Sequence, residues 1–399
     1  MINKKMYELG NKGSDIRELF EYGKKRKALV GNDNVFDFSL GNPNVSSPKE
    51  VNETLIKLLQ EEDSTVLHGY TSAPGDINVR KKIASYLNDT YSCTVDGQLI
   101  YLTVGAAAAL TISLNAIINE GDEVVVIAPY FPEYKVFIEK ANGKIKVVNS
   151  LVPSFKPDLN KLSAAINENT KAIIINYPNN PTGVLLNEEE IKELCLLLKQ
   201  KEKQYNNTIY LISDEPYREL IYSDNKYPFI TNYYDNSIVC YSFSKSLSLP
   251  GERIGYVLVN PKASNSIDLY KAICGAGRSL GYVCAPALFQ YMIPNCLGLT
   301  SDLNIYKTNR EILYNSLKEY GYDVVMPEGA FYLFVKALGD NSYEFSNLAK
   351  SYDLLLVPSD SFGYSGYVRI SYCVDTKQVL NSLRAFKRLI EDFKEKNNG

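Results

Sequence analysis

Short apolar runs alternate with helical segments through the middle of the chain, and this alternation constrains the fold more than any other feature. The apolar runs are QLIYLTVG, EVVVIAPY, KAIIINYP, TIYLISDEPY, SIVCYSFSK and RIGYVLVN. Helical segments such as FPEYKVFIEKAN and NEEEIKELCLLLKQKEK lie between these runs. In the second of these segments, the spacing of Asn187 and Glu190 predicts a capping box at the helix start. Apolar strands alternating with helices are typical of a largely parallel sheet covered on both faces. The sequence therefore predicts an α/β fold.

Polar or small residues stand at or just past the ends of several predicted strands. They are Gly105, Asn180, Asp214 and Lys245. In parallel sheets of this kind, ligands bind beyond the carboxyl ends of the strands. We therefore expect these residues to share one site.

The last hundred residues have a different pattern. A helical segment, LNIYKTNREILYNSLKEYG, precedes the strand-like runs AFYLFVKA, DLLLVPS and YVRISYC, and the helical QVLNSLRAFKRLIEDFKEK follows them. This order indicates an α+β unit, which we expect the N-terminal segment to join. A chain of 399 residues is also long for a single core. We predict a large domain of residues 45–290 and a smaller one of residues 1–44 and 291–399.

Charge and hydropathy exclude two classes of partner. The net charge is −3 and the pI is near 5.6, so nothing in the composition attracts nucleic acid or an acidic membrane surface. The start of the chain has no apolar stretch behind its lysines and is not expected to be a secretory signal. The uncharged stretch 100–119 contains Gly105, Thr111 and Asn115, and predicts a strand, a turn and a buried helix instead of a membrane span.

The cysteines and the single histidine limit the kinds of reactive site that the chain can form. Seven cysteines, with no CxxC pair, are typical of reduced thiols in the cytoplasm. The single histidine, His68, excludes a multi-histidine metal site and leaves a Ser-His-Asp hydrolase only one possible base. We expect no metal, and we expect proton transfer by a lysine, a tyrosine or a carboxylate, with His68 an ordinary loop residue.

The segment YSFSKSLSLPGERIGY surrounds Lys245 with serines and adds Arg253 eight residues later. A charged lysine at a buried strand end is unfavourable unless it has a partner. Each motif alone also has an ordinary explanation: Lys245 as a surface lysine, NYPNNPTGV as a polar turn, and Asp214 in SDEPYREL as a helix cap. TVGAAAALT could be a plain strand-turn-helix, although the N–H groups at such a helix start suit a phosphate.

In combination and in this order, the motifs are far more specific. The ordered set resembles the class I and II aminotransferases, fold-type-I pyridoxal-phosphate enzymes related to aspartate aminotransferase. Its members are GYTSAPGDINVRKKIA, NPTG, SDEPY, SFSK with GERIG, PEGAFYLF and VRIS. The resemblance runs from Asp37 to Cys373. It implies a mostly parallel seven-stranded central sheet in a large domain, a smaller α+β domain, and pyridoxal 5′-phosphate as the cofactor.

The resemblance also implies catalytic roles. Lys245 would hold the cofactor as a Schiff base and then move the proton between the substrate and the cofactor. Asp214 would keep the pyridine nitrogen protonated. Asn180 and Tyr217 would hydrogen-bond the phenolic oxygen of the ring, and Phe131 would stack on the ring, with Tyr134 as a further wall.

Binding roles are implied in the same way. The phosphate would be held by Tyr70 of a partner subunit and by a set from the same chain: Gly105, Ala106, Ala107, Ser242, Ser244 and Arg253. Ala107 departs from the family, which often has a hydroxyl there. The α-carboxylate of the substrate would be bound by Arg369, with Gly41 and Asn180 beside it.

The predicted function is an aminotransferase that moves the amino group of an L-amino acid to a 2-oxo acid such as 2-oxoglutarate. Aspartate is the first candidate donor, and aromatic or neutral amino acids stay open, because Arg278 is only a loose match to a second substrate-binding arginine. The alternative is a C–S β-lyase of the same fold, which shares the α-carbanion. A ligand-sensing transcription regulator would need more than the forty or so residues before SLGNPN and a more basic chain. We expect a cytoplasmic homodimer.

Overall fold

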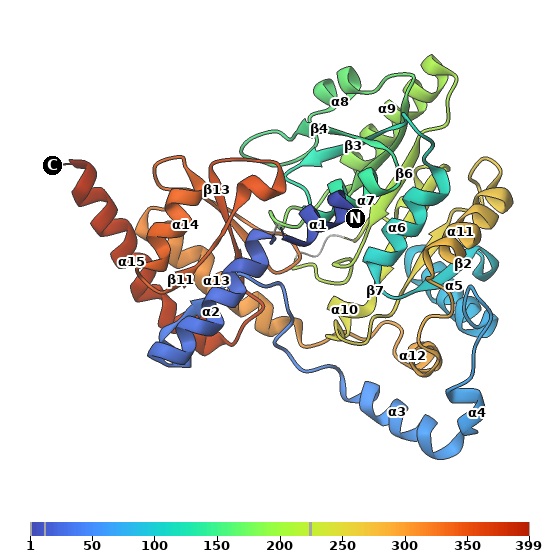
Figure 1. Ribbon diagram of the computed structural model, residues 1–399, viewed down its shortest axis with the longest axis horizontal. Coiled ribbons are helices and arrows are strands. Elements are labelled where there is room, and N and C mark those ends of the chain that lie inside the picture. The colour runs from blue at the N-terminus through green and yellow to red at the C-terminus, as the bar shows by residue number, and fades with distance from the viewer. Residues whose placement is uncertain (1, 12, 223–225, 399) are drawn as a thin grey trace.

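A seven-stranded sheet forms the centre of the larger part of the molecule (Figure 1). The computed structural model describes residues 2–11, 13–222 and 226–398. In spatial order the strands are β2 (Ile100–Thr103), β8 (Gly255–Val259), β7 (Ser237–Ser242), β6 (Tyr210–Asp214), β5 (Thr170–Ile175), β3 (Glu123–Ala128) and β4 (Lys144–Asn149). Only β8 is antiparallel to its neighbours. The prediction of a mostly parallel sheet in an α/β fold is confirmed.

Helices cover both faces of this sheet, because successive strand residues point to opposite sides and both sides are apolar. In β3, Val124 and Val126 belong to one buried cluster, and Val125 and Ile127 to another. The first cluster includes residues of α6 (Ala106–Ile117), α7 (Glu133–Lys140) and α11 (Ser266–Leu280), and the second includes residues of α5 (Ile77–Tyr91), α8 (Leu159–Ala165) and α9 (Glu188–Tyr205). α9 begins with the capping box predicted for Asn187.

Residues 100–119 form the predicted strand, turn and helix. β2 ends at Thr103, Gly105 caps α6 with φ +90°, and α6 ends at Ile117. Among the described residues, no helix has the length and apolarity needed to cross a membrane. The turn instead places the start of α6 at the carboxyl end of β2.

The C-terminal third builds a second core. β12 (Val357–Pro358), β13 (Tyr367–Ser371), β10 (Tyr332–Lys336) and β9 (Val324–Val325) form an antiparallel sheet in that order. α13 (Leu303–Tyr320), α14 (Ser342–Lys350) and α15 (Thr376–Asn398) complete the unit, and residues of all three join its apolar cluster.

The N-terminal segment lies against these C-terminal elements. After α1 (Lys4–Asn11), α2 (Asp15–Val30) runs from the middle of the molecule outward along them (Figure 1). β1 (Phe36–Asp37) pairs in parallel with β11 (Leu354–Leu355), and Arg26 forms a 2.6 Å ion pair with Asp353. The start of α2 thereby lies near the central sheet.

One predicted strand is divided. DLLLVPS contains both β11 and β12, which belong to different sheets. Leu354 and Leu355 pair with β1, whereas Val357 and Pro358 pair with β13. The strand that this run pairs with changes at Leu356, so one continuous apolar run contributes to two sheets. Pro358 lies on an edge strand, where its missing N–H is tolerated.

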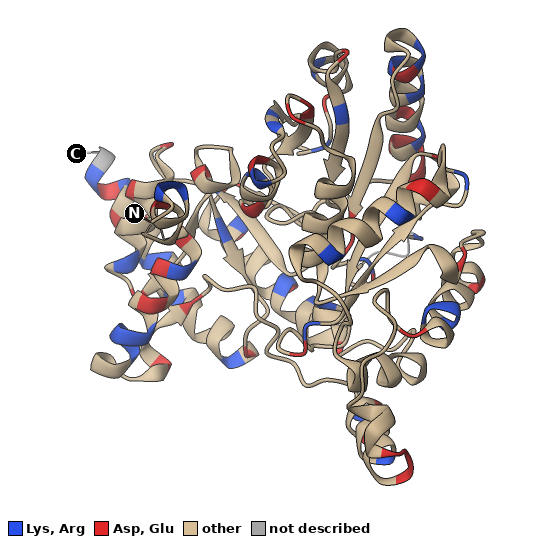
Figure 2. Ribbon diagram, turned by 45° about the vertical axis from the view of Figure 1, so that its right-hand side comes forward, with Lys and Arg blue, Asp and Glu red and all other residues tan. Residues whose placement is uncertain are grey.

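The remaining helices extend from the body of the larger part. α3 (Lys49–Glu61) and α4 (Ser64–Leu67) project away from it, and α12 (Ala287–Met292) packs against α3 (Figure 1). Figure 2 shows that basic and acidic residues are intermixed along the outer helices. This mixing agrees with the small net charge.

Candidate active site

A cavity of about 530 Å³ opens beyond the carboxyl ends of the central strands. Most of the residues predicted for the site line it: Gly41, Ala106, Ala107, Phe131, Asn180, Asp214, Tyr217, Ser242, Ser244, Lys245, Arg253 and Arg369. Two do not. Gly105 caps α6, directly before the lining residues Ala106 and Ala107, and Tyr70 is 98% exposed and lines a separate surface hollow with His68.

Lys245 lies in a short helical turn, α10 (Phe243–Ser246), directly after β7. Its Nζ donates a 2.6 Å hydrogen bond to the carbonyl of Gly41 and lies 5.4 Å from the centre of the Phe331 ring. The pKa of Lys245 is lowered to about 8, mainly by burial; Cys373 opposes this shift, and the guanidinium groups of Arg369 and Arg253 contribute to it. A substantial fraction of this amine is therefore neutral, and nucleophilic, near physiological pH.

Asp214 ends β6 with its side chain buried below the cavity. Its Oδ2 accepts a 2.5 Å hydrogen bond from the hydroxyl of Tyr134, and Asn176 donates to its backbone carbonyl at 2.8 Å. Its Oδ1 has no hydrogen-bond partner among the described residues. Burial raises the pKa of Asp214 to about 7, Glu215 raises it too, and the Tyr134 hydrogen bond opposes both. A buried carboxylate oxygen without a partner suits a protonated ring nitrogen.

Small donors gather at the other end of the cavity. The hydroxyls of Ser242 and Ser244 are 2.7 Å apart, and Arg253 Nη1 lies 3.4 Å from Ser244 Oγ. Arg253 Nη2 donates to the carbonyl of Val104 at 3.2 Å, beside the start of α6. A Cβ on Gly105 would lie 2.6 Å from Arg253 Nη2, so only glycine allows this approach. Guanidinium, hydroxyls and helix-start N–H groups together form a cradle for a phosphate.

Arg369, on β13, brings a cation from the C-terminal unit to the same cavity. It is only 2% exposed. Nη1 donates to Asn180 Oδ1 at 3.1 Å and Nη2 to the carbonyl of Ser39 at 2.6 Å, whereas Nε has no partner among the described residues. None of the ion pairs between described residues involves Arg369, and a buried cation without a counterion suits an anionic ligand.

Aromatic side chains complete the walls. Phe131, which is predicted to stack on the cofactor ring, lines the cavity. The prediction that Tyr134 forms a further wall is wrong: this residue of α7 is buried and does not line the cavity, and its hydroxyl donates a hydrogen bond to Asp214 instead. The hydroxyls of Tyr217 and Tyr332 are 2.8 Å apart. The predicted cofactor needs an amine, a carboxylate for its ring nitrogen and an anion cradle, and the residues fit it.

Several residues of the site carry no recognisable sequence signal. Tyr332 falls within PEGAFYLF, but nothing in that motif indicates that its hydroxyl meets Tyr217. Residues of the first turns of α2 also line the cavity: Ser14, Ile16, Arg17, Phe20 and Glu21. They belong to an ordinary amphipathic helix, and only its tertiary position could reveal them.

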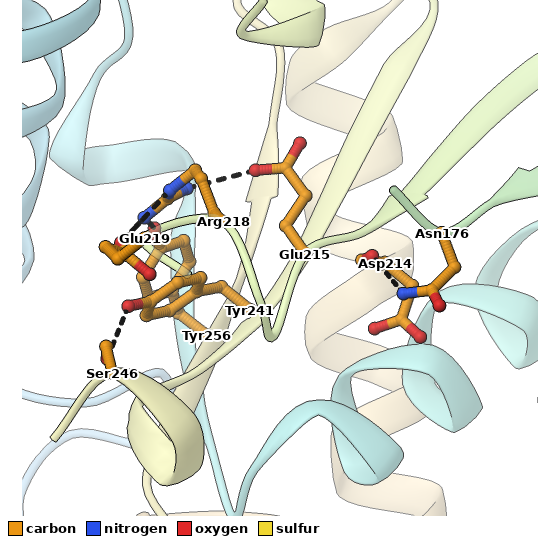
Figure 3. A network of polar contacts seen from close by, with 8 residues as sticks. All are labelled: Asn176, Asp214, Glu215, Arg218, Glu219, Tyr241, Ser246 and Tyr256. Atoms are coloured by element: carbon orange, nitrogen blue, oxygen red, sulfur yellow. Dashed lines mark hydrogen bonds and ion pairs between the residues drawn. The ribbon is translucent and has the colours of Figure 1, made fainter. Parts of the chain in front are cut away.

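A second buried network lies on the opposite side of β6 (Figure 3). Glu215 follows Asp214 and points away from it, toward Arg218. Arg218 is 2% exposed, forms ion pairs with Glu215 at 3.1 Å and Glu219 at 3.2 Å, and lies 4.2 Å from the centre of the Tyr241 ring. The hydroxyl of Tyr241 is 3.0 Å from that of Ser246, the neighbour of Lys245. The network therefore supports the α10 turn from behind.

Breaking this network is expected to be costly. An Arg218→Met variant leaves the buried Glu215 and the partly buried Glu219 without their counterion, and loss of the partner of a buried charge destabilises proteins by about 3–5 kcal/mol. Urea unfolding measures the loss, with the exposed Arg278 as a matched control in Arg278→Met. A loss below about 1 kcal/mol, the value typical of surface pairs, would contradict the assignment.

Comparisons with known proteins agree with this geometry. A model of the family "Aminotransferase class I and II" matches residues 33–386. The aspartate aminotransferase of Thermotoga maritima is 29% identical over 98% of this chain and 99% of its own. The probable aspartate aminotransferase of Methanocaldococcus jannaschii is 31% identical over 95% and 98%. A crystal structure of an amino transferase from Eubacterium rectale is 51% identical, has a TM-score of 0.97, and is matched over 98% of this chain and 99% of that one. The chain therefore belongs to the class I and II aminotransferases, a family of pyridoxal-phosphate-dependent enzymes.

Proposed function

We propose that this aminotransferase takes the amino group of aspartate and gives it to 2-oxoglutarate, with Lys245 as the catalytic base. The observation that carries the proposal is the convergence on one cavity of a lysine with a lowered pKa, a buried carboxylate with a free oxygen, and an unpaired buried arginine. The names of the relatives from Thermotoga maritima and Methanocaldococcus jannaschii support aspartate as the donor.

Pyridoxal phosphate, when bound, supplies an aldehyde that captures amino groups and a ring that withdraws electrons from the substrate Cα. Lys245 would hold the aldehyde through its Nζ, and the same nitrogen would serve as the base for the proton on the substrate Cα. Its pKa near 8 suits both tasks at neutral pH. Asp214 would hold the ring nitrogen in its protonated form through Oδ1, the oxygen that has no partner among the described residues.

The binding residues of the cavity would orient substrate and cofactor relative to Lys245. Arg369 grips the substrate α-carboxylate with two N–H groups, beside Asn180 and the backbone of Gly41. Tyr217 and Asn180 would donate hydrogen bonds to the phenolic oxygen of the cofactor, and Phe131 would pack against its ring. The phosphate would be held by Ser242, Ser244, Arg253 and the N–H groups at 105–107. Holding the phosphate and the α-carboxylate in this way would orient the Cα proton toward Lys245.

The proposal is tested by half-reactions of the purified holoenzyme without an acceptor. Aspartate is expected to convert the cofactor to its aminated form, seen as a shift in its visible absorbance, and to release one equivalent of oxaloacetate. Adding 2-oxoglutarate should reverse the shift. Glutamate, aromatic and neutral amino acids serve as comparison donors.

A C–S β-lyase is the alternative activity. Multiple turnovers of a cysteine-like substrate to pyruvate and ammonia, with no aminated cofactor, would favour it. If no amino acid altered the absorbance, both activities would be excluded.

We also propose a homodimer. Tyr70 is almost fully exposed, and the neighbouring α3 and α4 expose the apolar side chains of Ile56, Leu59 and Val66. A second copy that covers this surface would bury them and bring Tyr70 to the phosphate cradle of its partner.

The division into domains and the compartment are proposals of the same kind. We propose a large domain of residues 45–290 and a smaller one of residues 1–44 and 291–399, which the pairing of β1 with β11 supports. α12 and the turn after it lie at the second boundary. The seven free cysteines support a reducing compartment, the cytoplasm.

A further inference from the structure

Tyr332 contacts several groups of the candidate site, yet the proposed function gives its hydroxyl no role. The residue begins β10 and lines the cavity, although it is almost fully buried. Its hydroxyl oxygen lies 2.8 Å from that of Tyr217. The two rings meet edge to face with their centres 5.6 Å apart, and Phe331 packs against both. This packing fixes the place of the Tyr332 hydroxyl.

Tyr332 also lies against two residues proposed to bind the substrate α-carboxylate. A Cβ on Gly41 would collide with the Tyr332 hydroxyl, so glycine is needed there for the two to lie side by side. The guanidinium of Arg369 lies 4.7 Å from the centre of the Tyr332 ring. One side chain of the C-terminal unit therefore connects these two residues with Tyr217, the proposed donor to the phenolic oxygen of the cofactor.

The two hydroxyls together leave one proton for a ligand in the cavity. Each hydroxyl carries one proton, and the hydrogen bond between Tyr217 and Tyr332 uses only one of the two. Burial raises the pKa of Tyr332 to about 12 and holds the pKa of Tyr217 well above its ordinary value, so both stay protonated at neutral pH. Among the described residues, neither hydroxyl has a second hydrogen-bond partner. The oxygen that accepts within the pair therefore keeps its own proton free to donate.

The position of Arg369 favours Tyr332 as the donor within the pair. A cation near a phenol ring draws electrons from its O–H group and makes that group a stronger hydrogen-bond donor. In agreement with this, Arg369 opposes the rise that burial causes in the pKa of Tyr332. Tyr217 then accepts from Tyr332, and its own proton is left to point into the cavity.

We propose that Tyr332 is a positioning residue whose hydroxyl donates to that of Tyr217 and so directs the Tyr217 proton to the phenolic oxygen of the cofactor. The inference rests on the proposed function, because that function makes Tyr217 the donor to this oxygen. Hydrogen bonds in a chain polarise one another and strengthen each bond by about 10–30%. Tyr332 thus orients and strengthens the donor, and acts on the cofactor only through Tyr217.

A pH titration of the bound cofactor measures this effect without any substrate. The visible absorbance of the holoenzyme changes when the nitrogen that joins the cofactor to Lys245 takes up a proton. A donor to the phenolic oxygen neutralises negative charge close to that nitrogen, disfavours its protonation and lowers the pKa of the absorbance change. Tyr217→Phe loses a charge-assisted hydrogen bond, so it is expected to raise this pKa by about 1–2.

Tyr332→Phe is the decisive variant, because it keeps the ring and removes only the hydroxyl. Tyr217 remains in place but loses the polarising bond, so the same pKa is expected to rise by about 0.2–0.6, a fraction of the Tyr217→Phe effect. The other titratable groups around the pair are unchanged in both variants: Asp214, Lys245, Arg369 and Cys373.

Two further proteins separate this role from a general structural one. Tyr322→Phe is the matched control, because the buried Tyr322 hydroxyl donates to the carbonyl of Phe386 at 2.8 Å in the same C-terminal unit and does not line the cavity. It should leave the pKa of the absorbance change as in the wild type. In a Tyr217→Phe background, Tyr332→Phe should add no further rise, because its only route to the cofactor has been removed.

Three results would overturn the inference. A fall in the pKa of the absorbance change in Tyr332→Phe would mean that Tyr217 donates to Tyr332 in the wild type. A value within about 0.1 of the wild type would mean that the pair does not polarise the donor. A further rise in the double variant would mean that Tyr332 acts on the cofactor directly. None of these results affects the proposed function, which fails only if no amino acid converts the cofactor in the half-reactions.

Discussion

Replacing Lys245 by alanine is expected to lower transamination by at least about 10⁴-fold, the upper range for loss of a single positioned proton-transfer group. The variant loses both the nucleophile that holds the cofactor and the base that reaches the substrate Cα. No second lysine or histidine lines the cavity among the described residues, so no neighbour can replace it.

The covalent bond gives an independent readout. Borohydride reduction of the wild-type holoenzyme should fix the cofactor on the peptide that contains Lys245, as mass spectrometry would detect. Lys245→Ala should give no adduct, whereas Lys203→Ala, at an exposed lysine of α9, should give the normal adduct and rate. An adduct on another lysine, or activity above about 1% of wild type, would contradict the mechanism.

Replacing Asp214 by asparagine is expected to change activity and stability in opposite directions. Activity should fall by about 10²- to 10⁴-fold, because a neutral amide cannot keep the ring nitrogen protonated. The cofactor-free protein should become more stable, because burying a carboxylate is unfavourable until a ligand pairs with it.

The sign of the pH dependence follows from the raised pKa. Between the pKa of an unfolded aspartate, about 3.9, and the value of about 7 in the folded protein, the folded state holds a proton that the unfolded chain has released. The wild-type free energy of unfolding therefore falls as pH rises through this window. The advantage of Asp214→Asn should grow from about 1.5 kcal/mol at pH 5 to about 4 kcal/mol at pH 8.

Urea unfolding of the cofactor-free proteins at the two pH values measures this difference. Asp268→Asn makes the same substitution at an exposed position of α11 and should show no such growth with pH. A stability difference that stays constant between pH 5 and pH 8 would mean that Asp214 is already ionised in the empty site.

Much of the fold follows from local pattern. The apolar strands had to be buried on both faces, and the polar residues at their ends, such as Asp214 and Lys245, had to meet at one edge of the sheet. The division of DLLLVPS at Leu356 could not be predicted in this way, because both halves are equally apolar and only their partners differ.

The site was predictable where a motif fixes the backbone, and not where side chains meet across the fold. Tyr134 reaches Asp214 over 80 residues of sequence, and Tyr217 reaches Tyr332 over 115. Arg17 was missed for the same reason. Its helix has the periodicity of any surface helix, and its position on the cavity depends on how β1 and Arg26 attach the segment to the C-terminal unit.

The consecutive carboxylates at the end of β6 have a consequence for how this protein can evolve. Because neighbouring strand residues face opposite sides, a slip of β6 by one residue would turn Glu215 toward the cavity and Asp214 toward Arg218. Aspartate and glutamate carry the same charge but differ in side-chain length. The slipped protein would therefore keep its net charge, but the longer Glu215 would face the cavity and the shorter Asp214 would face Arg218. Insertions or deletions in the short 206–209 connection before β6 should therefore be selected against far more strongly than substitutions there.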